Sequence, residues 1–166
     1  MRICARHYTG TKGVYANIKP DYNTERLLTG IVWYTHPPFP THSVPYTSHV
    51  TLICSKVAID SATRIPFPRR SIKATLSGIE LWDIDGKGAA VFIVESPLFK
   101  HVHNLFVQRG AKHEFPRYIP HVTIAMGLPV SDTRVLNWVD TANAYIASNR
   151  HTLVFNSIKV RDMNCQ

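Results

Sequence analysis

The sequence predicts an α+β fold built on a mostly antiparallel sheet. Six strand-like runs and three helical runs follow one another along the 166 residues. The turn sequence DGKG at 85–88 joins two of the strand-like runs as a hairpin. The tripeptide HVT occurs in strand-like runs twice, at 49–51 and 121–123, which lie nearly half the chain apart. A duplicated fold would give this spacing.

The first half of the chain begins with a strand and a short helix. The run GVYANIKP at 13–20 alternates between apolar and polar residues, as a half-buried strand does. The run at 24–31 is typical of a helix, and Asn23 or Thr24 can cap it. Four prolines make residues 36–46 a loop, because proline interrupts helices and central strands. This loop leads into the strand SHVTLIC.

The middle of the chain is a hairpin followed by a helix. The hairpin strands at 71–84 and 89–96 flank the DGKG turn. The segment 96–110 has helical spacing of its apolar residues and ends in glycine. Ser96 is its expected N-cap, and Pro97 occupies the first helical position, where proline is favoured.

The last third contains the second HVT strand, a helix and a closing strand. Prolines precede the strand at 121–126, so both HVT strands are entered from proline-rich loops. The segment 131–149 is an amphipathic helix, and Trp138 on its apolar side is expected to lie in the core. The run at 152–160 is a strand.

Composition narrows the class of protein. The length fits one domain over 1–166, and no apolar run approaches the ~18 residues that span a bilayer, so we expect a cytoplasmic protein without a membrane partner. The three cysteines are too few and too scattered for a disulfide framework or a cysteine zinc site. The net charge of +8 fits either an anionic partner or a generally basic surface.

The two HVT tripeptides carry the chemistry. In a strand, residues two apart share a face, so His49 points with Thr51 and His121 with Thr123. Side by side, these strands would put two imidazoles and two hydroxyls around one phosphate. One imidazole can take a proton and the other can give one, without a metal or cofactor. Chance alone supplies about one HxT match; the HYT at 7–9, which lacks a following apolar run, is interpreted as such a match.

The paired motifs resemble the 2H phosphoesterase superfamily, which is named for two H-x-[ST] motifs on opposed strands. Segments 13–20, 48–53, 74–97 and 110–127 are similar to blocks of the phage anti-CBASS proteins, small phosphodiesterases that destroy the cyclic oligonucleotide signals of bacterial antiviral defence. The resemblance implies one domain of two pseudo-symmetric lobes, each contributing one HVT strand. A central cleft with flanking helices would lie between mostly antiparallel strands.

The resemblance also implies a substrate and a mechanism. The substrates would be cyclic di- or trinucleotides, cleaved by attack of a ribose 2′-OH through a 2′,3′-cyclic phosphate. The roles of acid and base among the two histidines stay open, as does the oligomeric state, and no stable nucleic-acid complex is expected. Two other functions stay open: a 2H RNA-processing enzyme acting on 2′,3′-cyclic phosphate ends or 2′–5′ linkages, and a cyclic-nucleotide sponge without turnover.

Aromatic residues are candidates for holding the bases, because bases stack on aromatic rings. Tyr15 lies on the polar face of its strand, where it either contacts the ligand, as the resemblance implies, or packs in the core. Trp82 lies near the hairpin turn, at a position suited to the rim of a site. The resemblance implies an acidic and an aromatic ligand contact near the C-terminus; Phe155 supplies the aromatic one, and a clear acidic counterpart is absent from the sequence.

Other candidates are cations and one tyrosine. Lys19, Arg117 and Tyr118 can bind phosphate or base, although such cations are more often only solvated. Arg117 and Tyr118 lie just ahead of the second HVT and are the better placed. His101 and His103 diverge on a helix, so no metal site is expected from them.

Overall fold

The computed structural model describes residues 2–40, 48–59, 65–68, 70–113, 115 and 117–163. The predicted strands and helices are all present in the predicted order, and an additional strand, β1, precedes them. Residues 41–46 of the predicted proline-rich loop lie outside the described part. The elements are β1 (Arg2–His7), β2 (Gly13–Pro20), α1 (Tyr22–Tyr34), β3 (Val50–Ser55), β4 (Ile72–Ile84), β5 (Lys87–Glu95), α2 (Pro97–Val107), β6 (His121–Leu128), α3 (Thr133–Ser148) and β7 (Thr152–Met163).

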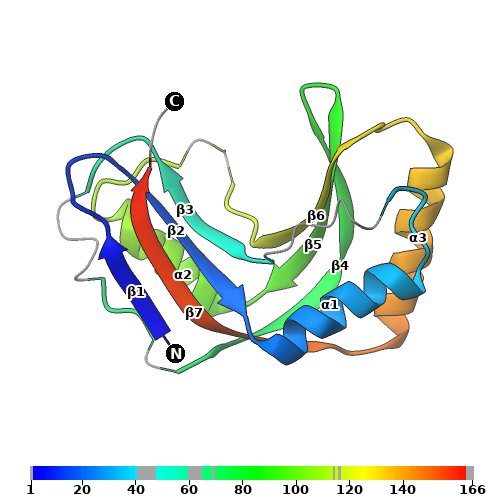
Figure 1. Cartoon of the computed structure of the whole chain (residues 1–166), viewed down its shortest axis with the longest axis horizontal. Coiled ribbons are helices and arrows are strands. Elements are labelled where there is room, and N and C mark those ends of the chain that lie inside the picture. The colour runs from blue at the N-terminus through cyan, green and yellow to red at the C-terminus, as the bar shows by residue number, and fades with distance from the viewer. Residues whose placement is uncertain are drawn as a thin grey trace.

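The described strands form a seven-stranded sheet in the order β1-β7-β2-β3-β6-β5-β4, and β7 also pairs with β4. The pairing of β1 with β7 is parallel, and the others are antiparallel. Figure 1 shows a strongly curved sheet, with β1, β7, β2 and β3 in one half and β4, β5 and β6 in the other. The predicted α+β class with a mostly antiparallel sheet is confirmed.

The hairpin between β4 and β5 is the one that the DGKG sequence predicts. Asp85 and Gly86 both have positive φ, 52° and 79°. Two such residues make the type I′ turn, whose twist matches that of the flanking strands. The Gly86 N–H also donates to the Asp83 carboxylate at 2.8 Å. This hairpin carries Trp82 next to its turn.

The start of α2 agrees with the sequence, but α2 ends at Val107, before the predicted end at Gly110, and the start of α1 also differs. The Thr24 N–H donates to the Asp21 carboxylate at 2.8 Å, so Asp21 is the N-cap and the predicted caps, Asn23 and Thr24, are wrong. The Thr24 hydroxyl instead accepts from the Val154 N–H, which ties α1 to β7. In α2, Ser96 and Pro97 occupy the predicted positions, although the Ser96 side chain forms no cap hydrogen bond.

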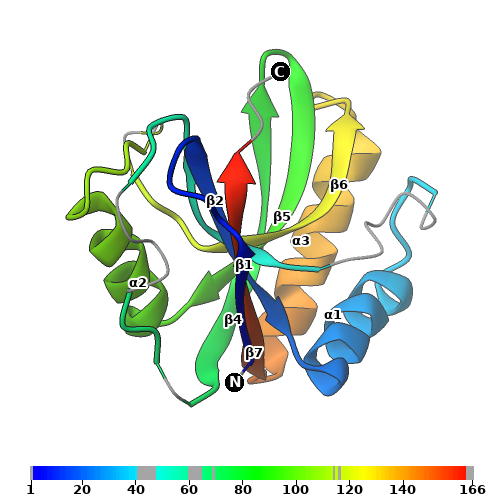
Figure 2. The ribbon, with the colours of Figure 1, turned by 60° about the vertical axis from the view of Figure 1, so that its left-hand side comes forward.

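The helices cover different parts of the sheet. Figure 2 shows α2 on one side of the strands and α1 and α3 on the other. Trp138 of α3 is only 4% exposed, and its indole N–H donates to the Thr35 hydroxyl at the end of α1. Its predicted place in the core is confirmed. No helix within the described ranges is long and apolar enough to cross a membrane.

Phe155 corrects a prediction. Its side chain is fully buried on β7 and packs edge-on against Phe99 of α2, with ring centroids 5.2 Å apart. A ring without exposed surface cannot stack on a ligand base. The prediction of Phe155 as a substrate contact is therefore wrong, and the residue instead joins α2 to the first half of the sheet.

Candidate catalytic site

The two HVT segments meet where the halves of the sheet join. Val50 of β3 pairs with Val122 of β6 in antiparallel register. Extending this register by one residue each way sets His49 opposite Thr123 and His121 opposite Thr51. Because both valines are buried on one face, the four polar side chains project from the other face. The predicted side-by-side placement of the two HVT segments is confirmed, with the histidines at diagonal corners.

A cavity of about 630 Å³ opens on this face. Its size is ordinary for a small-molecule site. The cavity walls come from β2, β3, the β4–β5 hairpin, the segment before β6, and β6 itself. Among the predicted site residues, those that line it are Tyr15, Thr51, Trp82, Arg117, Tyr118, His121 and Thr123.

His49 contacts the cavity wall through Tyr15. The Tyr15 hydroxyl lies 2.9 Å from His49 Nε2 and 3.4 Å from Thr51 Oγ1. The Arg161 guanidinium carbon lies 4.8 Å from the centroid of the Tyr15 ring, in a cation–π arrangement. Sequence reasoning missed Arg161, which reaches Tyr15 only because β2 and β7 pair in this register.

His121 has a different environment. Its Nδ1–H donates to the Ile119 carbonyl at 2.8 Å, so Nε2 is the unprotonated nitrogen of the neutral ring. Burial, the largest cause, lowers the pKa of His121; the hydrogen bond to Ile119 opposes this, and the nearby His49 adds to it. The neutral form is therefore favoured near pH 7, ready to accept a proton.

Trp82 holds one side of His121. The two ring centroids lie 4.5 Å apart in an edge-on arrangement. The indole N–H donates to the Glu80 carboxylate at 2.6 Å, which fixes the ring on the hairpin. Sequence reasoning placed Trp82 at the rim of the site but missed Glu80, two residues earlier on the same strand.

Tyr118 connects the two HVT strands. Its hydroxyl donates to the Thr51 carbonyl at 3.0 Å, and burial raises the pKa of this hydroxyl, so it stays a donor. Its ring stacks on His103 of α2 with centroids 4.0 Å apart. His103 Nδ1–H in turn donates to the Leu52 carbonyl at 2.7 Å. This chain of contacts holds the segment that precedes His121 against β3.

His103 makes stability dependent on pH. Burial, the largest cause, lowers the pKa of His103 below 6.5; the Leu52 hydrogen bond opposes this, and His113 adds to it. The unfolded chain therefore binds more protons than the folded one as pH falls below 6.5. The free energy of unfolding should stay level above that pH and decline below it, down to the folded pKa, by at most about 1.4 kcal/mol per pH unit for this one group.

Chemical denaturation across pH 5 to 8 measures this effect. His103→Gln should flatten the decline, whereas His101→Gln, a matched change at an exposed position of the same helix, should leave it intact. An unchanged pH dependence in His103→Gln would contradict the assignment. The exposure of His101 and the burial of His103 also confirm that the two side chains diverge.

The structure leaves two other polar residues outside the cavity. Lys19 is half-buried on β2 and does not line it. Thr9, from the third HxT match, donates through its N–H and its hydroxyl to the Asp162 carboxylate. Within the described residues, no group of three His, Cys, Asp or Glu side chains could hold a metal ion.

The curved sheet, with two HxT segments paired at its centre, has a 2H phosphoesterase-like fold. Solved structures of Usb1 from Kluyveromyces marxianus share the fold. One has a TM-score of 0.51 and 12% identity, covering 91% of this chain and 93% of that one. Another, with uridine monophosphate, has a TM-score of 0.55 and 14% identity, covering 94% and 96%.

The sequence comparisons identify a family, whereas the structural comparisons show only the fold. The family model described as anti-CBASS protein Acb1 matches residues 12–147, and the chain belongs to this family. The Acb1 protein of Vibrio phage KVP40 is 28% identical over 116 residues, which is 69% of this chain and 73% of the relative. The Acb1 protein of Acinetobacter phage Ac42 is 29% identical over 116 residues, with the same coverage. The chain is thus an anti-CBASS protein with phage relatives.

Proposed function

We propose that this protein is a metal-independent phosphodiesterase that hydrolyses the cyclic di- or trinucleotide signals of CBASS immunity. The pairing of Val50 with Val122 carries the proposal, because it puts two imidazoles and two hydroxyls on one face beside a cavity. The family supplies the anti-CBASS role. In the same proposal, residues 1–166 form a single domain of two pseudo-symmetric lobes, each contributing one HVT strand.

The environments of the two histidines suggest their roles. His121, neutral and with Nε2 unprotonated, takes the proton from a ribose 2′-OH. The 2′-oxygen then bonds to phosphorus while the bond from phosphorus to the 5′-oxygen breaks. His49 gives its proton to the departing 5′-oxygen, and Tyr15 holds the His49 ring. The product is a linear oligonucleotide with a 2′,3′-cyclic phosphate, which water opens with the two roles exchanged.

The remaining cavity residues bind and orient the substrate. The hydroxyls of Thr51 and Thr123 donate to the non-bridging phosphate oxygens, where charge develops. Trp82 stacks a base beside His121, and Tyr118 lines the same wall. Arg117 on the cavity wall adds positive charge near the phosphates, and Arg161, behind the Tyr15 ring and outside the cavity lining, adds to the same field, in keeping with the net charge of +8.

A substrate with sulfur in place of the departing 5′-oxygen tests the role assignment. A thiolate leaves without protonation, so this analogue needs a base but no acid. His49→Ala should cleave the sulfur analogue at a rate close to that of the parent protein, whereas His121→Ala should remain slow on both substrates. Rates are measured by release of thiol. Rescue of His121→Ala instead would reverse the two roles.

A substrate panel tests the function itself. Cyclic dinucleotides, cyclic trinucleotides and linear RNA with 2′,3′-cyclic phosphate ends or 2′–5′ linkages are compared by kcat/KM. The proposal predicts that cyclic substrates are preferred. Preference for linear RNA would favour the RNA-processing function, and release of unchanged cyclic ligand on denaturation would favour a sponge. Two titratable side chains on the same face of the sheet argue against pure binding, which needs neither.

A further inference from the structure

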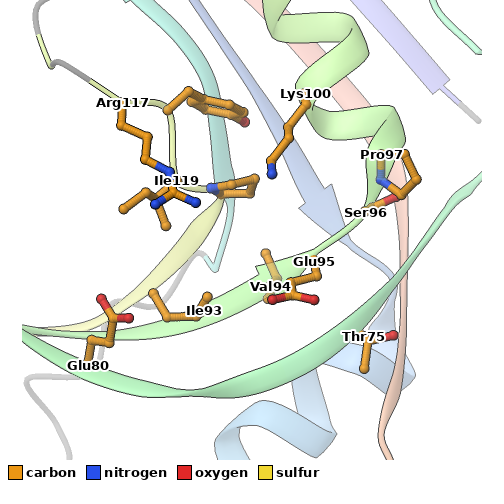
Figure 3. Close-up of a pocket in the computed structure, with 12 residues that line it drawn as sticks. Thr75, Glu80, Ile93, Val94, Glu95, Ser96, Pro97, Lys100, Arg117 and Ile119 are labelled. Carbon is orange, nitrogen blue, oxygen red and sulfur yellow. The ribbon is translucent and has the colours of Figure 1, made fainter.

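A second cavity, of about 660 Å³, adjoins the catalytic one. The two cavities share Arg117, Tyr118 and Ile119 as a common wall. On its other sides the second cavity is lined by β4, β5 and the first turn of α2 (Figure 3). It has the volume of a small-molecule site and lies one wall away from the reacting histidines.

The charges of the second cavity are separated. Figure 3 shows Lys100 entering from α2 and Arg117 from the segment before β6, with Glu80 and Glu95 on the opposite side. No ion pair links these cations to the carboxylates within the described part of the chain. Glu80 already accepts the Trp82 indole hydrogen bond, so Glu95 is the carboxylate left for a ligand. Lys100 and Arg117 facing Glu95 across the cavity suit a ligand with an anionic end and a donor-bearing end.

The start of α2 supplies further groups for the anionic end. Ser96 is only 7% exposed, lines the cavity and forms no side-chain cap hydrogen bond. Its hydroxyl forms no hydrogen bond with any other described residue. The N-terminus of an 11-residue helix carries partial positive charge and favours a phosphate.

We propose that the second cavity is a nucleotide subsite. The phosphate lies at Ser96, Lys100 and the start of α2, and the amino group of the base donates to Glu95. The choice of a nucleotide rests on the proposed function, since a cyclic oligonucleotide or its linear product brings further nucleotides within reach of the adjoining cavity. Arg117 lines both cavities, so it would contact the substrate in the catalytic cavity and the nucleotide in the second cavity.

Isothermal titration with adenosine 5′-monophosphate tests this subsite. Lys100→Ala should weaken binding by about tenfold and Ser96→Ala by less, because a charge-assisted hydrogen bond contributes more than a neutral one. Lys12→Ala removes the same charge from an exposed position outside both cavities and should leave binding unchanged. Because inorganic phosphate lacks the donor-bearing end, it should bind more weakly than the nucleotide.

Three results would overturn the proposal. Equal weakening by Lys12→Ala would show a general charge effect, and equal affinity for inorganic phosphate would show an anion site only. Binding lost in His121→Ala but kept in Lys100→Ala would place the nucleotide in the catalytic cavity. Hydrolysis of a cyclic dinucleotide by the unsubstituted protein is measured in parallel, so that failure of the proposed function is seen separately from failure of the subsite.

Discussion

Replacing His121 or His49 with alanine is expected to lower kcat/KM for a cyclic dinucleotide by about 10²–10⁴-fold, the range that general acid–base catalysis contributes. The loss should appear mainly in kcat, because each imidazole transfers a proton in the transition state. Trp82 and Tyr118, which bind the bases in the proposal, are unchanged in these variants. Initial rates of linear product formation measure it. The double variant should be little worse than either single one, since the two groups act as a unit.

The matched control for these variants is His101→Ala. His101 is exposed on α2 and lines neither cavity, so its removal should leave kcat/KM unchanged. Circular dichroism of each variant checks that the fold persists. A variant at His49 or His121 that folds and keeps full activity would remove that histidine from the mechanism.

The second large effect is on stability. Phe155→Ala should cost about 3–5 kcal/mol of unfolding free energy, because it empties a fully buried site against Phe99. Urea denaturation measures the loss. Tyr22→Ala removes an aromatic ring that is 70% exposed and should change stability little.

A milder substitution of Phe155 distinguishes a role in core packing from a role in ligand binding. Phe155→Leu keeps most of the apolar volume, so the protein should fold and retain its KM for a cyclic dinucleotide. A raised KM without loss of stability would restore Phe155 as a ligand contact. The alternation of apolar residues along β7, with Leu153 and Phe155 on one face, already indicated burial, but the predicted role came from resemblance instead.

Local signals account for what could be predicted of the fold. The hairpin was predictable because its turn and both strands are adjacent in sequence. β1 was not, since its run RICARH interrupts the apolar pattern with cations and its partner β7 lies at the far end of the chain. The start of α1 was missed because Asp21, directly after Pro20, caps the helix two residues ahead of Asn23.

The site, too, has features that local sequence predicts and features that depend on contacts between distant segments. Strand register alone predicts that His and Thr of each HVT share a face, and the pairing of Val50 with Val122 then joins the two motifs. The contacts of Arg161 with Tyr15 and of His103 with Leu52 depend on pairing and packing between distant segments. No periodicity in the sequence could have indicated them.

The most direct test of the central claim follows one cyclic dinucleotide with this protein in EDTA by ³¹P NMR. The account predicts that the 3′–5′ phosphodiester signal decreases while the signal of a 2′,3′-cyclic phosphate appears, and that His49→Ala and His121→Ala suppress both changes. An unchanged phosphodiester signal across cyclic di- and trinucleotides would contradict the proposed activity. Cleavage that requires added metal would contradict the two-histidine mechanism.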